Sequence, residues 1–431
     1  MPSRFVPTLG ILCLGVLASI SCPATENWPE VRGPTGDGLA PDSQGLPHQW
    51  GPDKNIVWKT AIPGRAWSSP VVWGDQVWVS NATQDGSEMS AVCVDRKSGD
   101  IIHDLLLFEN ETVEPLGNPV NGYGSPSPVI EQGRAYLHFG SYGTAAIDTA
   151  NGKVVWERAD LPCRHFRGPG SSPVLYGDLL ILTMDGVDTQ YLAALDKATG
   201  ETVWKTARST EWDDVEAGGK IRGDGDFRKA YTTPTFVEVG GRAIMISPGA
   251  KACFAYDPSN GKELWYITYT GFSNASRTVT AGGHAFINTG FGKPHLVSVK
   301  LDPDASGDIT DTHVVWDILK RVPKRSSPVI AGGRLYMTTD EGILSCIDLE
   351  SGEAVWSERL RGHFSGSPVF ADGKLYFFSE MGDAFVVKPG DQFQLLATNK
   401  IDDAGFMASP AVAGRSIFAR SKTHLYRIEQ R

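Results

Sequence analysis

The stretch that decides the fold runs from Ser326 to Trp356 and reads SSPVIAGGRLYMTTDEGILSCIDLESGEAVW. It contains four short runs rich in β-branched and aromatic residues, separated by Gly-Gly, Asp-Glu-Gly and Glu-Ser-Gly. Turn signals of this kind between β-rich runs predict four short antiparallel strands. A single four-stranded sheet has two faces to bury, so it needs neighbours. The chain supplies them by repeating the pattern.

The repeats are best marked by a Ser-Pro or Thr-Pro pair that leads into the first strand. The base unit of about 40–45 residues is the size of a four-stranded propeller blade. One copy, Asn274–Thr289, is degenerate, and we place Arg277 where its proline should be. The seven regular anchors are Pro70, Pro128, Pro173, Pro234, Pro328, Pro368 and Pro410.

The two ends of the repeat array complement each other. The last anchor, Pro410, is followed by only about three strands, whereas Asn55–Gly64 reads as a lone fourth strand with Trp58 at its end. Completing the last blade with this strand closes a ring and removes the exposed edges that an open array would leave. We therefore predict an all-β fold, an eight-bladed β-propeller of four-stranded antiparallel blades closed by an N-terminal strand. An open solenoid of the same repeats is the alternative, but it would need polar caps at both ends.

The region before the propeller has two parts. An apolar run at Leu9–Ser21 indicates a signal peptide over residues 1–24, and a lipoprotein signal with the lipid on Cys22 is the alternative. Residues 25–54 form a Gly- and Pro-rich lead-in that we expect to be a loop, and residues 55–431 form one propeller domain. We expect an exported, periplasmic or secreted monomer that does not span the membrane.

Composition and motifs exclude several function classes. The net charge of −10 argues against a nucleic-acid partner. Walker A, H-E-x-x-H and G-x-S-x-G motifs are absent from the sequence. Four cysteines follow the predicted signal, with no C-x-x-C pair among them. Cys93 and Cys346 occupy the same place in the repeat, so we expect small buried side chains rather than a disulfide between them.

The end of the repeat has its own signature, an Asp followed by Gly four residues later and Trp four residues after that. Together with the Ser-Ser-Pro starts, this signature resembles the pyrroloquinoline-quinone-like (PQQ-like) propeller repeat family, from about Asn55 to the end of the chain. The resemblance implies that each Trp packs between neighbouring blades. The lead-in also looks like the leader of secreted propellers from environmental bacteria such as planctomycetes. The copies are 95–103 (with His in the Trp position), 148–156, 196–204, 257–265 and 348–356.

Two branches of this family imply different functions. The quinoprotein alcohol and glucose dehydrogenases hold PQQ and Ca²⁺ over the channel, and the alcohol dehydrogenases often carry a pair of adjacent cysteines there. The propeller lipoprotein of the outer-membrane β-barrel assembly machinery has no cofactor and binds partner proteins. This chain has no adjacent cysteines, and no Ca²⁺-ligand set or catalytic Asp can be aligned, so we predict no metal site and assign no catalytic residue.

The first hypothesis is therefore a non-enzymatic, extracytoplasmic binding or scaffold propeller that binds an envelope protein or a small anionic ligand at the channel mouth. The alternative is a PQQ-dependent oxidoreductase of the alcohol or sugar dehydrogenase type, with PQQ as its cofactor. A small-molecule or glycan-binding propeller is a third hypothesis.

A site is expected on the loops that lead into each innermost strand, because these loops open together near the channel. Several carry Arg or Lys just before the Ser-Pro pair although the protein is acidic. One interpretation is a ring of cations and aromatic side chains that binds an anion. The other is a set of structural salt bridges with acids of neighbouring loops. The candidate residues are Trp67, Tyr123, Arg167, Arg228, Tyr231, Arg277, Arg325 and Phe364.

The longest insertion, Ser209–Tyr231, holds two alternating acids, Asp224 and Asp226, in a Gly-rich loop. Two acids are too few for a complete Ca²⁺ shell, so we expect a solvated loop there rather than a metal site.

Overall fold

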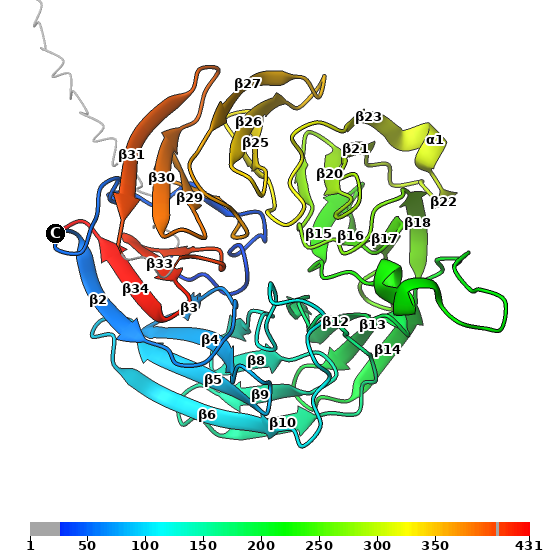
Figure 1. Ribbon diagram of the computed structural model, residues 1–431, viewed down its shortest axis with the longest axis horizontal. Helices are drawn as coiled ribbons and strands as arrows, with labels where there is room; N and C mark the ends of the chain where they lie inside the picture. Colours follow the sequence, from blue (N-terminus) through cyan, green and yellow to red (C-terminus); the bar gives the residue numbers. More distant parts are fainter. Residues whose placement is uncertain (1–25, 402–404) are drawn as a thin grey trace, which may run out of the picture.

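Eight antiparallel sheets stand around a central channel in the computed structural model, which describes residues 26–401 and 405–431 (Figure 1). Helical structure in these residues is limited to α1 (Thr310–His313) and the 3-10 helix η1 (Arg222–Arg228). The predicted all-β, eight-bladed propeller is therefore confirmed. The predicted signal peptide and Cys22 lie outside the described residues.

Within each blade the chain runs from the channel outward, and short turns join consecutive strands. Blades one and two comprise β3 (Val71–Trp73), β4 (Gln76–Ala82), β5 (Glu88–Asp95), β6 (Ile101–Glu109), β7 (Val129–Glu131), β8 (Arg134–His138), β9 (Thr144–Asp148) and β10 (Val154–Arg158). Blades three and four comprise β11 (Val174–Tyr176), β12 (Leu179–Asp185), β13 (Gln190–Asp196), β14 (Thr202–Ala207), β15 (Thr235–Val239), β16 (Arg242–Pro248), β17 (Ala252–Tyr256) and β18 (Glu263–Thr268).

The remaining blades follow the same order. Blades five and six comprise β19 (Val279–Ala281), β20 (His284–Asn288), β21 (Leu296–Lys300), β23 (Val314–Ile318), β24 (Val329–Ala331), β25 (Arg334–Thr338), β26 (Ile343–Asp348) and β27 (Ala354–Arg359). Blade seven comprises β28 (Val369–Ala371), β29 (Lys374–Phe378), β30 (Asp383–Lys388) and β31 (Gln394–Lys400). Blade eight comprises β32 (Ala411–Ala413), β33 (Ser416–Arg420), β34 (His424–Glu429) and β2 (Ile56–Ala61). A two-residue strand, β22 (Gly307–Asp308), pairs in parallel with the outer edge of blade four.

The ring is closed as the sequence predicts. Strand β2 pairs antiparallel with β34 and becomes the outermost strand of blade eight, so residues from the two ends of the described chain share one sheet. Trp58 on β2 is 8% exposed and packs against Phe418 of the same blade, with 6.0 Å between ring centroids. This closure leaves no blade without two neighbours.

The repeated Gly and Trp form the contact between blades. The ring of Trp156 lies against Gly200 of the next blade, where a Cβ atom would come within 2.7 Å of it. Gly200 also has a φ of +78°, which favours glycine. The indole Nε1 of Trp156 donates to the carbonyl of Lys197 in the same turn at 3.0 Å. Trp58, Trp204 and Trp316 pack in the same way on Gly99, Gly261 and Gly352.

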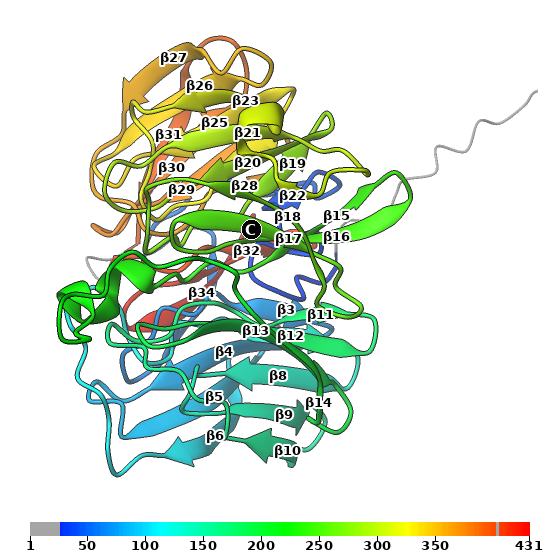
Figure 2. The same cartoon turned by 90° about the vertical axis from the view of Figure 1, so that its right-hand side faces the viewer.

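The lead-in pairs with the propeller through backbone hydrogen bonds and a short strand, whereas we expected only a loop. Trp28 and Val72 exchange backbone hydrogen bonds of 2.8 Å, and β1 (Leu39–Ala40) pairs in parallel with β28. Glycine-rich sequence carries no strand period, so this pairing has no signature in the sequence. The segment crosses the channel on the side away from the loop face that carries η1 (Figure 2). It therefore closes one end of the channel.

Candidate functional site

A pocket of about 710 Å³ lies on the channel axis at the loop face, which we call the mouth face. Its walls come from the loops that enter the inner strands, and its floor includes Val31 and Arg32 of the lead-in. Aromatic side chains, including Trp67, Phe272 and Phe291, line the upper wall. The pocket therefore opens at the mouth face and is closed below by the lead-in. Its volume lies in the range of pockets that hold a small ligand.

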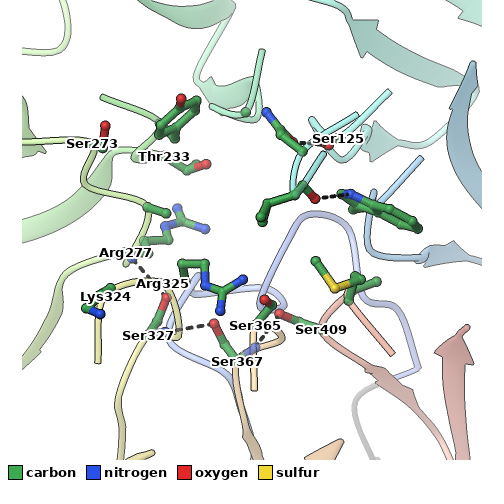
Figure 3. Close-up of a pocket in the computed structure, with 18 of the residues that line it drawn as sticks. Ser125, Thr233, Ser273, Arg277, Lys324, Arg325, Ser327, Ser365, Ser367 and Ser409 are labelled. Carbon is green, nitrogen blue, oxygen red and sulfur yellow. Dashed lines mark hydrogen bonds between the residues drawn. The ribbon is translucent and has the colours of Figure 1, made fainter. Parts of the chain in front are cut away.

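A belt of hydroxyl groups surrounds the lower part of this pocket. It consists of the residue before the anchor proline in seven blades, and each hydroxyl oxygen accepts a hydrogen bond of 2.8–3.0 Å from the backbone N–H of the equivalent residue in the preceding blade. Figure 3 shows three of its members side by side. The hydroxyl belt comprises Ser69, Ser127, Ser172, Thr233, Ser327, Ser367 and Ser409.

Arg277 occupies the eighth position of the belt, which corrects our alignment of blade five. Val279 pairs with Phe286 just as Val71 pairs with Trp78, so Thr278 stands where other blades have proline. Arg277 therefore replaces the belt hydroxyl rather than the proline. The sequence prediction placed Arg277 one residue too late in the repeat, because this copy has no proline to mark the position.

The guanidinium of Arg277 fastens the lead-in to the propeller. Its Nη1 donates to the carbonyl of Val31 at 2.8 Å, its Nε donates to the carbonyl of Pro234 at 3.0 Å, and its Nη2 lies 3.1 Å from Glu30. Arg277 is 3% exposed, and burial raises the pKa of the Glu30 carboxyl. Arg277, a predicted site residue, thus holds the floor of the pocket in place, and we call this set of contacts the latch.

Arg32 is the cation of the floor itself. Its guanidinium donates to the carbonyl oxygens of Gly36, Asp37, Pro328 and Pro368. Among the described residues no carboxylate hydrogen-bonds to it, and burial lowers its pKa to about 9. These four bonds leave one of the five guanidinium N–H groups, on Nη1, without a partner in the described part of the chain.

Four other predicted site residues meet in the pocket. Trp67 donates from Nε1 to the carbonyl of Val120 at 2.8 Å, and Tyr231 also lines the pocket. Arg167 makes a bidentate pair with Asp226 of the long insertion at 2.6 and 2.8 Å. Arg325 donates to Asp340 at 2.8 Å and lies 3.4 Å from Glu380, and its guanidinium extends toward the pocket centre (Figure 3).

The other three predicted residues are not part of the lining. Tyr123 is buried between blades one and two and donates to the carbonyl of Glu114 at 2.8 Å. Arg228 is held by a bidentate bond to Asp214 at 2.9 and 2.5 Å. Phe364 is 1% exposed in the core of blades six and seven. Position in a mouth loop does not fix side-chain direction, and the sequence carries no further signal for it.

Most basic side chains of the mouth form ion pairs with acidic side chains, which agrees with the interpretation of these residues as structural salt bridges. Arg167, Arg277 and Arg325 each contact a carboxylate, and Lys324 lies 3.8 Å from Glu341. The features that sequence reasoning missed are Arg32 and the hydroxyl belt. The second Ser of Ser-Ser-Pro recurs in most blades, and this recurrence is the signal that would have identified the belt.

A buried lysine lies behind Tyr231. The backbone N–H of Ser141 donates to Nε2 of His165 at 3.0 Å, so the proton of this neutral imidazole resides on Nδ1. Nδ1 lies 3.2 Å from Nζ of Lys229 and 3.9 Å from Sγ of Cys163. Burial lowers the pKa of Lys229, and its Nζ donates to the carbonyl of Asp185.

The cysteine prediction is confirmed, since all four described cysteines are buried and free. Within residues 26–401 and 405–431 no group of three or more His, Cys, Asp and Glu side chains could hold a metal ion. In the same residues no helix is long and apolar enough to cross a membrane.

Comparisons with known proteins place the chain among PQQ-like propellers. The profile of the family described as "Outer membrane protein assembly factor BamB" matches residues 42–165 and 306–400, about half of the chain. A curated relative, outer membrane protein assembly factor BamB of Shewanella oneidensis, is 24% identical over 260 residues, which cover 57% of this chain and 59% of the relative. The chain therefore matches less than two thirds of the length of that relative.

Solved structures show the same fold. BamB of Moraxella catarrhalis superposes with a TM-score of 0.57 at 13% identity, over 86% of this chain and 99% of that one. Quinohemoprotein alcohol dehydrogenase of Comamonas testosteroni superposes with a TM-score of 0.66 at 14% identity, over 95% of this chain and 81% of that one. At these identities the likeness establishes the fold alone.

Proposed function

Because the chain belongs to the family described as outer membrane protein assembly factor BamB, we propose that it is a non-enzymatic binding or scaffold propeller that acts outside the cytoplasm. Its mouth face holds an envelope protein, and the pocket at the centre of that face takes a ligand or a side group of the partner.

The observation that carries this proposal is a set of exposed apolar side chains around the mouth. Val120 and Phe227 lie on the two long insertions and are 45% and 39% exposed. Met381, in the loop between β29 and β30, is 43% exposed. Other exposed apolar side chains, such as Ile102 and Val203, lie on outer strands, so it is the position of these three beside the pocket that supports an interaction site.

The residues present do not fit the PQQ and Ca²⁺ that the dehydrogenase branch implies. The acids that line the pocket are Asp226, Asp340 and Glu341, and each is engaged by an arginine or lysine. They come from separate loops and form no cluster with the composition of a metal site in the described residues. We therefore derive no catalytic step through a quinone.

The proposal is tested by capturing partners from solubilised bacterial envelopes on the immobilised protein. A Val120→Asp, Phe227→Asp double variant should lose the partners that the wild type retains, because a charge at the centre of an apolar interface opposes its desolvation. Val203→Asp is the matched control, since Val203 is 53% exposed on outer strand β14, away from the mouth. Equal capture by all three proteins would reject the mouth face as the binding surface.

The oxidoreductase alternative has its own test. The purified protein is mixed with PQQ and Ca²⁺, and dye reduction is followed with a panel of alcohols and sugars. We expect neither quinone binding nor reduction, and turnover with any of these substrates would overturn the proposed function.

A further inference from the structure

The hydroxyl belt supplies hydrogen-bond donors to the base of the pocket. A hydroxyl group has one O–H donor and two acceptor lone pairs. In the belt one lone pair is taken by a backbone N–H of the neighbouring blade. No acceptor for the seven belt hydrogens is found in the described residues, and every belt residue lines the pocket while more than nine-tenths buried. The belt therefore offers O–H groups to whatever the pocket holds.

Two guanidinium groups add further donors, one from the floor of the pocket and one from above the belt. Arg32 in the floor has one Nη1–H left after its four bonds to carbonyl oxygens. Arg325 uses Nε for Asp340 and Nη1 for Glu380, so Nη2 has no partner among the described residues. Figure 3 shows this guanidinium above Ser327, Ser367 and Ser409. A group with two acceptor oxygens could meet the belt and Arg325 together.

The charged groups and the wall residues of the pocket restrict the chemical class of its ligand further. The acids of the lining are already bound by basic side chains, whereas the hydrogen bonds of Arg32 go only to carbonyl oxygens, so in the described residues no carboxylate is hydrogen-bonded to this cation at the base. A sugar needs acceptors as well as donors, and the belt provides mainly donors. Above it, Trp67, Phe272, Phe291 and Met407 provide an apolar wall.

We propose that the base of the pocket binds a single carboxylate group whose apolar or aromatic body lies against the wall above it. This inference rests on the proposed function, which makes the mouth a binding site, and it names the chemistry that the site selects. The carboxylate is either that of a free small acid or the C-terminal carboxylate of a polypeptide, since both present the same head group. The volume of about 710 Å³ admits either one.

The wild-type protein tests the head group without any variant. Binding of 3-phenylpropionate and of 3-phenylpropionamide is compared by calorimetry, and the acid should bind at least about tenfold more tightly, because both of its oxygens accept and carry the negative charge, whereas the amide offers one neutral acceptor oxygen. A hexapeptide ending in Phe is compared in the same way as free acid and as C-terminal amide. Acid selectivity in the peptide pair alone indicates a polypeptide source, and in the small pair alone a free acid. Equal binding of acid and amide in both pairs, or failure of all four probes to bind, overturns the inference.

Variants then locate the site. Arg325→Gln and the Ser367→Ala, Ser409→Ala pair should each weaken binding of the preferred acid about tenfold and leave binding of its amide unchanged. Arg242→Gln is the control. Arg242 forms a half-exposed ion pair with Asp257 at the opposite end of blade four, so this variant should bind the acid like the wild type. Acid binding that survives both pocket variants overturns the assignment. Partner capture by the wild type is measured separately. Partner capture without acid selectivity would reject the carboxylate site alone, whereas absence of capture would reject the proposed function.

Discussion

Removing the Arg277 side chain tests whether the lead-in is latched across the channel. Arg277→Met deletes two hydrogen bonds to carbonyl oxygens and leaves Glu30, whose side chain is only 13% exposed, without its cation. Breaking a buried ion pair in this way costs about 3–5 kcal/mol of folding free energy. Urea denaturation followed by tryptophan fluorescence should show a loss of this size at pH 7. Limited proteolysis should also cut residues 28–50 first, since Arg277 is one of the contacts that fasten this segment to the propeller.

The second partner supplies the internal check. Glu30→Gln combined with Arg277→Met removes both charges, so the double variant should recover more than about 1 kcal/mol relative to Arg277→Met alone. Because burial raises the pKa of Glu30, acidification should also relieve the single variant as that carboxyl takes up a proton. Arg242→Met is the control at a half-exposed pair and should cost less than about 1 kcal/mol. A loss below about 1 kcal/mol for Arg277→Met, or no recovery in the double variant, would refute the latch.

Three other substitutions test the ring and the buried groups. Trp58→Ala should cost about 3–5 kcal/mol in urea denaturation, since it opens a cavity at the closing strand; a cost near zero would mean that β2 does not hold the ring. Lys229 has a lowered pKa, so wild-type stability should rise with pH from the folded-state pKa of this amine up to about 10.4, because the unfolded chain holds the proton more tightly than the folded chain does. Lys229→Met, which removes the titrating amine, should flatten that slope in melts from pH 7 to 10, and an unchanged slope would contradict the lowered pKa of Lys229. Gly225→Ala should cost about 1–3 kcal/mol, because its φ is +83° and a Cβ would meet the carbonyl of Val187; unchanged proteolysis of the insertion would count against this.

The repeat made most of the fold predictable. A period of strands, Gly turns and Trp ends recurs often enough that eight blades follow, and the lone strand at Asn55–Gly64 reveals the closure. Each blade uses the same local rules, so a local pattern is sufficient there. Blade five has Thr278 where the other blades have proline, so no marker in the sequence would have placed Arg277 correctly.

The site was less accessible to sequence reasoning because it depends on side-chain direction and on partners distant in the chain. Arg277 and Glu30 are far apart in sequence, as are Arg32 and the carbonyl of Pro368. Phe364 lies in the same kind of loop as Arg325, yet it turns into the core. Residue type and loop position identified five lining residues, whereas the floor of the pocket required the path of the lead-in.

The closing strand also has a consequence for how the molecule folds. Strand β2 is made early but has no partner until β34 emerges after nearly the whole propeller. Pairings this distant in sequence slow folding, and an unpaired strand edge invites association with other chains in the meantime. The first seven blades can each form from local hairpins, so blade eight should be the last to assemble. The same strand that seals the finished ring is therefore the segment most exposed to misassembly while the chain is still incomplete.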